Sequence, residues 1–306
     1  MKEIDRNNRV AIVGGTHGNE WIGAYLVKKF EQFPQLIQRE HVEGFTLLAN
    51  PRAFAAGRRY IDKDLNRCFR SENLADLTVS SYEENRAKEI CTLLKPKCNS
   101  QTDWIIDLHS STANMGITII PVSDHPHNLR LAAYLSSINP QVRVYRWQGS
   151  EQEKSCLRSV CSLGCAIEVG AIAQGTIDAR LFQQTEEIVC AILDYLNTVN
   201  QETVLALDYS LVIYQGIEAV DYPRNEKGEI QAMIHPQLQS QDYQPLHPGD
   251  PMFLTFEGEP IAYIGDSVVY PVFINEAAYY EKGIAMCLTN ETKISKVMFT
   301  EALRDP

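Results

Sequence analysis

A histidine and a carboxylate stand three positions apart, directly after the first apolar run of the chain. Residues 10–13 are apolar, Gly14 and Gly15 follow, and His17 and Glu20 come next. The apolar run predicts a buried strand, and the glycines predict the sharp turn that ends it. Ligands of open α/β sheets bind beyond the carboxyl ends of strands, where this pair is expected. Both residue types bind metals, but one isolated pair at this spacing also arises by chance.

A second histidine, His109, ends another predicted strand at residues 104–109. Two histidines and one glutamate form the ligand set of hydrolytic zinc sites, which leave a fourth position for water. Zinc lowers the pKa of that water and polarises a substrate carbonyl. His17, Glu20 and His109 are therefore predicted to bind one Zn²⁺ per chain; the alternative is a histidine that only hydrogen-bonds at a strand end. Asp107 is expected on the same face of its strand, where it can orient a ligand.

Glu168 lies between Ile167 and Val169 in a further predicted strand. Burying a carboxylate without a partner is costly. It is therefore either a member of a buried salt bridge or a site group whose raised pKa suits proton transfer. Metal-assisted hydrolysis needs a base that takes a proton from water and returns it to the leaving nitrogen. Glu168 is predicted to fill that role.

An arginine-rich segment with many turn residues follows the second predicted strand. It contains Arg59, Asn66 and Arg67. Guanidinium groups bind carboxylates through two parallel hydrogen bonds, and a neighbouring amide adds direction. The segment is a candidate anion-binding site, although a solvated basic loop would have the same composition.

The elements that must position these residues alternate between apolar runs and amphipathic patterns, which predicts an α/β sheet with helices on both faces. Asn19 is expected to cap the first helix. Strands are expected at 10–13, 44–48, 104–109, 116–121, 141–147 and 166–170, and helices at 22–30, 81–95, 127–137 and 177–199. Beyond residue 203, short β-type runs alternate with proline and glycine turns. We therefore expect a catalytic domain over 1–203 and a smaller, mainly β domain over 204–306, packed tightly together.

Composition narrows the class of protein. The chain has 306 residues, of which 44% are hydrophobic, so it can bury a substantial core. A net charge of −11 argues against nucleic acid as a partner, although a local arginine cluster can still bind an anionic substrate. No apolar run approaches the ~20 residues of a membrane helix, and the charged N-terminus is unlike a secretory signal. With its scattered cysteines, the chain is expected to be cytoplasmic, without a membrane or nucleic-acid partner.

Short blocks of sequence that run almost from end to end identify a family. They are 14–20 (GGTHGNE), 50–53 (NPRA), 59–62 (RYID), 64–67 (DLNR), 107–109 (DLH), 167–170 (IEVG), 220–224 (VDYPR), 246–253 (LHPGDPMF) and 270–282. With these blocks the chain resembles the aspartoacylase and succinylglutamate desuccinylase family, zinc amidohydrolases similar to zinc carboxypeptidases. The resemblance implies a carboxypeptidase-like mixed sheet flanked by helices, followed by a smaller β domain that helps to close the active site.

The resemblance also implies roles for residues. His17, Glu20 and His109 would ligate zinc. Glu168 would be the general base and acid, and Arg59 would polarise the scissile carbonyl and stabilise the oxyanion. The residues expected to contact substrate are Arg59, Asn66, Arg67, Lys154, Arg158, Glu168 and Tyr279.

Two positions depart from the family pattern. Lys154 stands four residues before Arg158, where a tyrosine is usual, and Ser110 follows His109, where asparagine is usual. A lysine can still pair with a substrate carboxylate, so we expect hydrolysis of N-acetyl-L-aspartate to acetate and L-aspartate. The alternatives are an acylase for aromatic or other acidic N-acyl amino acids, and a non-catalytic binder of acidic amino acids. The family also suggests a homodimer.

Overall fold

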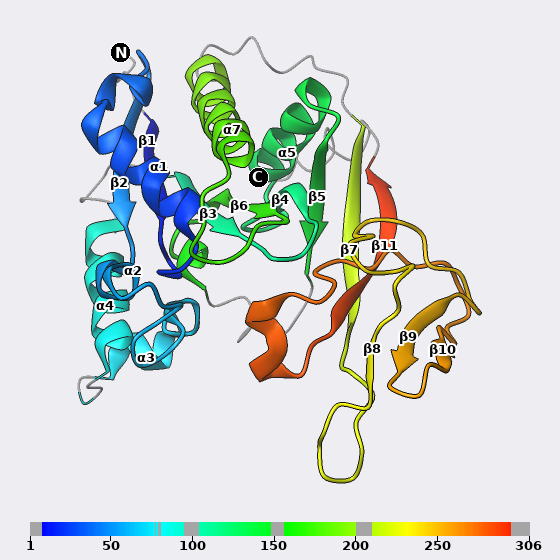
Figure 1. Cartoon of the computed structure of the whole chain (residues 1–306). Coiled ribbons are helices and arrows are strands. Elements are labelled where there is room, and N and C mark those ends of the chain that lie inside the picture. The colour runs from blue at the N-terminus through cyan, green and yellow to red at the C-terminus, as the bar shows by residue number, and fades with distance from the viewer. Residues whose placement is uncertain are drawn as a thin grey trace.

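The computed structural model describes residues 8–76, 78, 81–94, 104–147, 156–199 and 210–294. Its main feature is an eight-stranded mixed sheet (Figure 1). The strands of this sheet are β1 (Asn8–Gly14), β2 (Val42–Leu48), β3 (Trp104–Ser110), β4 (Gly116–Pro121), β5 (Val142–Arg146), β6 (Leu163–Gly170), β7 (Leu211–Val220) and β11 (Met286–Ile294). They lie in the order β11-β7-β5-β4-β6-β3-β1-β2. Neighbouring strands are parallel except for the antiparallel pairs β6–β4 and β7–β11.

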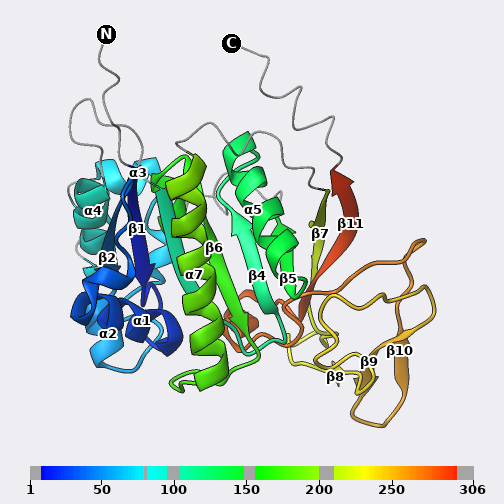
Figure 2. The same cartoon turned by 90° about the horizontal axis from the view of Figure 1, so that it is seen from above.

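Helices cover both faces of the sheet, as the sequence predicts (Figure 2). The helices are α1 (Trp21–Gln32), α2 (Pro51–Ala55), α3 (Ser71–Ala75), α4 (Tyr82–Leu94), α5 (Pro126–Ile138) and α7 (Ala179–Val199), with 3₁₀ turns η1 (Pro34–Leu36), η2 (Leu65–Arg67), η3 (Leu157–Val160) and η5 (Ala277–Lys282). α1, α5 and α7 pack on one face, and α4 packs on the other with η2 and η3. Each predicted strand and helix of this part is present, with bounds shifted by a few residues.

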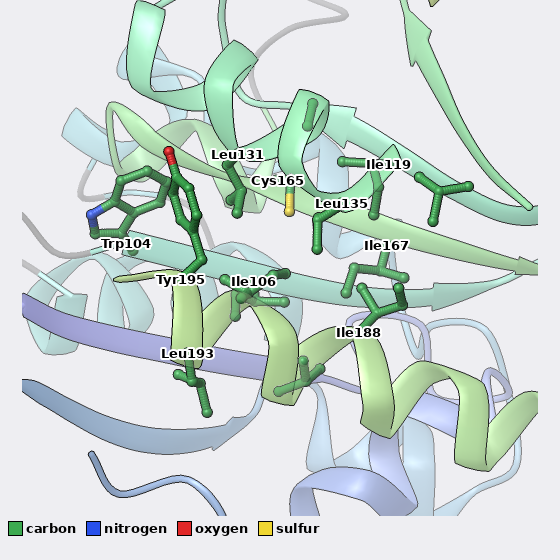
Figure 3. Close-up of a cluster of buried hydrophobic side chains, with 14 of the residues drawn as sticks. Trp104, Ile106, Ile119, Leu131, Leu135, Cys165, Ile167, Ile188, Leu193 and Tyr195 are labelled. Carbon is green, nitrogen blue, oxygen red and sulfur yellow. The ribbon is translucent and has the colours of Figure 1, made fainter. Parts of the chain in front are cut away.

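Alternation along the strands separates a packing face from a site face. Ile106 of β3 belongs to the apolar cluster under α5 and α7 (Figure 3), whereas Ile105 packs against α4 on the opposite face. Asp107 and His109 follow Ile105 at two-residue steps, so they point to the α4 side of the sheet. Cys165 and Ile167 of β6 likewise face α5 and α7, which leaves Glu168 on the site face.

The first helix begins differently from the sequence-based expectation. Its N-cap is Glu20, which makes no side-chain cap hydrogen bond. Asn19 does not cap the helix; its Nδ2 donates to Gln174 Oε1 at 2.6 Å. The prediction was wrong because Glu20, one position further on, occupies the cap while its carboxyl is held by other partners.

The C-terminal part completes the main sheet and adds a second one. β7 and β11 are two of the eight strands of the main sheet, and β8 (Ala232–Ile234), β9 (Pro251–Thr255) and β10 (Pro260–Ala262) form a separate antiparallel sheet. The apolar cluster of this small sheet also includes Met286 and Leu288 of β11. The expected fold class, a mixed α/β sheet flanked by helices and followed by a smaller β-rich part, is confirmed. The division at residue 203 falls outside the described residues and stays a prediction. Within those described, no helix is both long and apolar enough to cross a membrane.

Candidate active site

A cavity of about 430 Å³ collects most of the residues singled out in the sequence. It lies on the α4 side of the sheet, the side on which Figure 1 also shows η5, drawn in orange. The predicted site residues that line it are His17, Glu20, Arg59, Asn66, Arg67, His109, Arg158, Glu168 and Tyr279. Lys154 lies outside the described residues, so its predicted substrate contact stays a prediction.

The turn after β1 presents His17 because its glycines allow the backbone to pack closely. A Cβ on Gly14 would lie 2.2 Å from Gly23 O, and one on Gly18 would lie 2.1 Å from Ala53 C. Gly15 has φ +67°, a conformation that favours glycine. Side chains at these positions would push the turn away from α1 and α2. The double glycine of the sequence is therefore a steric requirement of the turn that carries His17.

Three buried side chains point ligand atoms at one another. One ligand atom from each of His17, Glu20 and His109 lies within 4.8 Å of the others. His17 Nδ1 lies 2.6 Å from Glu20 Oε1, and His109 Nδ1 lies 2.9 Å from Glu20 Oε2. Two nitrogens and a carboxylate suit a divalent cation such as zinc. The cluster could therefore hold a metal ion, with Nδ1 as the ligand atom of both histidines.

A carboxylate lies behind each of these histidines. His17 Nε2 is 3.1 Å from Asp64 Oδ1, and His109 Nε2 is 2.9 Å from Asp107 Oδ2. The fully buried Asp107 is held in turn by Thr16, whose hydroxyl donates to Oδ1 at 2.8 Å. A carboxylate beside Nε2 favours a proton there, which leaves Nδ1 unprotonated for a metal. This second layer supports the metal-site interpretation independently of the three ligands.

Asp107→Asn is expected to weaken metal binding by about 10- to 100-fold, the usual effect of removing such a partner. An asparagine amide facing Nε2 would favour the tautomer with the proton on Nδ1, where the metal must bind. Competitive titration with a fluorescent zinc chelator measures the affinity. Asp266→Asn, an exposed position, is the control. Equal affinities for the two variants would contradict an orienting role for Asp107.

The charges of the site explain how a buried cluster stays ionised. Burial raises the pKa of the Glu20 carboxyl, but His17 and His109 outweigh this effect and hold the pKa well below its usual range. Burial lowers the pKa of His109, but Asp107 and Glu20 outweigh it and hold that pKa well above its usual value. The positive charge of His109 therefore offsets the carboxylates around it. A bound cation would take over this role and release that proton.

Glu168 lies beside His109 on the neighbouring strand and lines the same cavity. The two residues are paired in the parallel β3–β6 register. Burial raises the pKa of Glu168 to about 8, although the positive charge of His109 opposes the shift. A carboxyl with a pKa near neutrality can both accept and return a proton. No cation lies within salt-bridge distance of Glu168 in the described part of the chain, so the buried salt-bridge alternative finds no support there.

Arg59 of the arginine-rich segment lies beside the candidate metal ligands, so this part of the segment is not a solvated loop. Arg59 Nη1 is 3.1 Å from Glu20 Oε1, and Nη2 is 3.5 Å from Asp64 Oδ2. Asn66 is buried, and its Oδ1 accepts a hydrogen bond from Leu157 N at 3.0 Å. That bond ties η2 to η3 and leaves the Asn66 NH₂ as the donor available to a ligand.

Tyr279 reaches the cavity from η5, which a buried carboxylate anchors to the loop after β3. Glu276 Oε2 accepts from Thr112 N at 2.7 Å, Thr112 Oγ1 at 2.9 Å and Ala113 N at 3.2 Å. Its Oε1 accepts from Ala278 N at 2.9 Å. One glutamate thus joins the C-terminal part of the chain to the loop that follows His109.

Glu276→Ala is expected to lower the free energy of unfolding by about 3 kcal/mol, because it leaves several buried donors without an acceptor. It should also raise KM, since Tyr279 is no longer held over the cavity. Chemical denaturation and steady-state kinetics check the two effects. Glu257→Ala, at an exposed turn, is the control. A free energy of unfolding within about 0.5 kcal/mol of the wild-type value, the usual range for a neutral surface substitution, would contradict the anchoring role.

Sequence reasoning missed three residues of this region. Asp64 stands in a quoted motif, but nothing in its local pattern places it behind His17. Glu276 lies more than 160 positions from the loop that it holds, so no local signal marks it. Lys282 lines the cavity beside Arg67 and Tyr279, with Nζ 4.8 Å from the centre of the Tyr279 ring. The available signal for Lys282 was its spacing: it follows Tyr279 by three positions, which places both side chains on the same side of one helical turn.

The cavity also has an apolar wall, whose side chains pack together in one cluster. The wall consists of Ile120, Tyr145, Trp147, Phe273 and Ile284. A ligand of this cavity can therefore place a charged part among the arginines and a less polar part against this wall. Together, the α/β sheet, the cluster that could hold a metal, and the adjoining carboxyl and guanidinium groups define a metal-dependent hydrolase type of site.

Comparisons with known proteins place the chain in one family. Residues 6–196 match the succinylglutamate desuccinylase/aspartoacylase catalytic domain, and residues 209–291 match the AstE/AspA barrel-sandwich hybrid domain. The chain is 54% identical over 292 residues to a probable aspartoacylase of Nostoc sp., covering 95% of this chain and 99% of that protein. It is 42% identical over 289 residues to the human N-acyl-aromatic-L-amino acid amidohydrolase (carboxylate-forming), covering 92% and 90%.

A solved structure agrees with these sequence matches. The crystal structure of murine aminoacylase 3 superposes with a TM-score of 0.87 at 39% identity, covering 96% of this chain and 98% of that one. The chain therefore belongs to the succinylglutamate desuccinylase and aspartoacylase family, which confirms the resemblance found in the sequence. The expected enzyme class, a hydrolase of amide C–N bonds, is confirmed with it.

Proposed function

We propose that the protein is a zinc-dependent deacylase of N-acyl amino acids, with N-acetyl-L-aspartate as the preferred substrate. The observation that carries the proposal is the grouping of His17, Glu20 and His109, with Glu168 and Arg59 at the same cavity. One Zn²⁺ held by the two Nδ1 atoms and the Glu20 carboxylate would supply a Lewis acid that activates water and polarises a carbonyl. The rest of the chemistry belongs to the side chains.

Glu168 takes the proton of the attacking water and later gives it to the leaving nitrogen. Its raised pKa suits both steps, because a base with a pKa near the working pH holds and releases protons readily. Arg59 places a fixed positive charge beside Glu20, where the scissile carbonyl oxygen would lie. That charge stabilises the oxyanion as it forms. When the nitrogen has received its proton, the C–N bond breaks to give a carboxylate and a free amino acid.

The cationic side of the cavity supports an acidic substrate. Arg67, Arg158 and Lys282 line it with Asn66, so it can hold more than one carboxylate. N-acetyl-L-aspartate has two carboxylates. The relatives named probable aspartoacylase point in the same direction. Lys154 is proposed as a further contact of the substrate.

The apolar wall favours a second candidate substrate class. Tyr145, Trp147 and Phe273 could pack against an aromatic side chain, and the human relative is named for N-acyl aromatic amino acids. Aromatic–aromatic contacts of this kind favour binding by about 0.5–1.5 kcal/mol beyond area burial. An aromatic substrate would use only one carboxylate subsite, which leaves part of the cationic cluster without a partner.

Steady-state kinetics on N-acetyl derivatives of aspartate, glutamate, phenylalanine and tyrosine separate the candidates. The proposal expects the highest kcat/KM for the aspartyl compound. A higher value for the aromatic compounds would replace it with the second candidate. A protein that binds aspartate but binds no zinc and hydrolyses nothing would be the non-catalytic binder. The homodimer and the cytoplasmic location remain predictions, which size-exclusion chromatography with light scattering and cell fractionation can test.

A further inference from the structure

Glu83, on the first turn of α4, is a fully buried carboxylate whose hydrogen bonds come from neutral groups. Oε1 accepts from Ile61 N at 2.7 Å and from Asn50 Nδ2 at 3.1 Å. Oε2 accepts from Asp62 N at 3.0 Å and from Lys63 N at 3.2 Å. Three consecutive backbone amides around one anion form a nest, and the start of a helix also favours negative charge. The charge of Glu83 is thus satisfied inside the protein, away from the cavity.

The segment held by Glu83 has no helix or strand of its own between α2 and η2. Its conformation therefore depends on individual anchors. Asp62 provides one of these anchors: its Oδ2 accepts a hydrogen bond from Tyr82 N, at the start of α4, at 2.8 Å. At the other side, Arg59 O accepts from Gly18 N at 3.1 Å. Glu83 is the acceptor for all three amides of residues 61–63.

Both ends of this segment touch proposed metal ligands. Arg59, two residues before the nest, lies 3.1 Å from Glu20 Oε1. Asp64, directly after the nest, lies 3.1 Å from His17 Nε2. A shift of the segment would therefore move a guanidinium and a carboxylate away from the site together.

We propose that Glu83 is a positioning residue of the active site: its carboxylate fixes residues 61–63 so that Arg59 and Asp64 lie against Glu20 and His17. This inference rests on the proposed function. Glu83 touches neither substrate nor metal and acts through the two residues that it places. The role differs from core packing, because it requires two acceptor oxygens and not only a side chain of this size.

Glu83→Gln tests that requirement, because glutamine has nearly the same shape but one acceptor oxygen fewer. Its NH₂ group would face donors, so at least one backbone amide loses its acceptor. Glu84→Gln is the matched control. Glu84 is on the same turn and contacts the same segment through Lys63 Nζ at 2.5 Å, but it accepts from none of the three amides.

Amide hydrogen exchange, zinc affinity and kinetics are measured on both variants in the full chain. We expect exchange at residues 61–63 to rise at least about tenfold in Glu83→Gln and to stay unchanged in Glu84→Gln. Zinc affinity and kcat should each fall by about 10- to 100-fold, with a smaller change in KM. Adding Arg59→Lys to Glu83→Gln should cost less than the product of the single losses, because both act through Arg59. Glu83→Asp, which keeps both oxygens, should recover part of the activity and serves where Glu83→Gln does not fold.

Two results would overturn the inference. One is unchanged exchange at residues 61–63 in Glu83→Gln. The other is faster exchange with wild-type zinc affinity and kcat, which would make Glu83 purely structural. A wild-type protein that neither binds zinc nor hydrolyses N-acyl amino acids would instead refute the proposed function, and the catalytic part of this inference with it. The exchange data separate these cases, because they depend on neither metal nor substrate.

Discussion

Replacing Glu168 by glutamine is expected to lower kcat by about 10²- to 10⁴-fold, the usual contribution of a general acid–base group. Glutamine keeps the shape of the side chain on β6 but can neither take a proton from water nor return one to nitrogen. The zinc content should stay at one per chain, because Glu168 is not among the three proposed ligands. Steady-state kinetics and metal analysis of the same preparation check both statements.

The control for this variant is Glu187→Gln, on the exposed side of α7. It makes the same chemical change away from the cavity and should keep wild-type kcat. A Glu168→Gln protein that turns over at more than a tenth of the wild-type rate would contradict the base assignment. Loss of zinc from it would instead indicate that Glu168 supports the metal.

The pH dependence gives a second test of Glu168. The base must be ionised, so kcat/KM should rise with pH as the Glu168 carboxyl loses its proton. Burial raises its pKa to about 8, and a bound cation nearby would favour the ionised form. The acid limb of the profile should therefore have its midpoint between the ordinary glutamate range and 8. Once the site is saturated with zinc, adding more zinc should leave the midpoint of the kcat/KM profile unchanged.

Local patterns explain which parts of the molecule could be predicted from the sequence. The apolar run before Gly14, the alternation in β3 and the carboxylate within β6 each carry their signal in a few neighbouring residues. Together they predicted the strands, the grouping of His17, Glu20 and His109, and the position of Glu168. The same reasoning failed for Asn19, because its side chain bonds Gln174 on a distant segment instead of the adjacent helix. The preference of asparagine for the N-cap position applies to an isolated helix, whereas in this fold a tertiary contact determines where the Asn19 side chain lies.

The groups that support the site were harder to find because their partners are far away in the sequence. Asp64 contacts His17 across 47 positions, and Glu276 contacts Thr112 across 164. Because the chain has 39 acidic residues, nothing in the neighbouring sequence distinguishes the few that support the site from the rest. Glu83 is the sharpest case, since the fold buries it completely and nothing in its neighbouring residues indicates this. Long-range polar contacts are therefore what the structure adds to the motifs.

Replacing His109 by glutamine is expected to remove the metal and to lower activity by about 10³-fold or more. The proposed site offers three ligands, and losing one leaves a pair that binds zinc too weakly to stay occupied. Lewis-acid stabilisation is worth several kcal/mol, and each 1.36 kcal/mol corresponds to about tenfold in rate. Metal analysis after gel filtration and kinetics with added zinc measure both effects. His125→Gln, at an exposed position before α5, is the control and should keep metal and rate.

Chelation of the wild-type protein gives the complementary result. Dialysis against a chelator should abolish activity, and added zinc should restore it in the wild type but not in His109→Gln. Metal binding must displace the proton that Asp107 and Glu20 stabilise on His109, whose pKa lies well above its usual value without metal. Zinc affinity should therefore rise with pH. The proton on His109 and the metal compete for the same side chain, whose Nδ1 lies 2.9 Å from Glu20 Oε2. A wild-type affinity independent of pH would contradict His109 as a ligand.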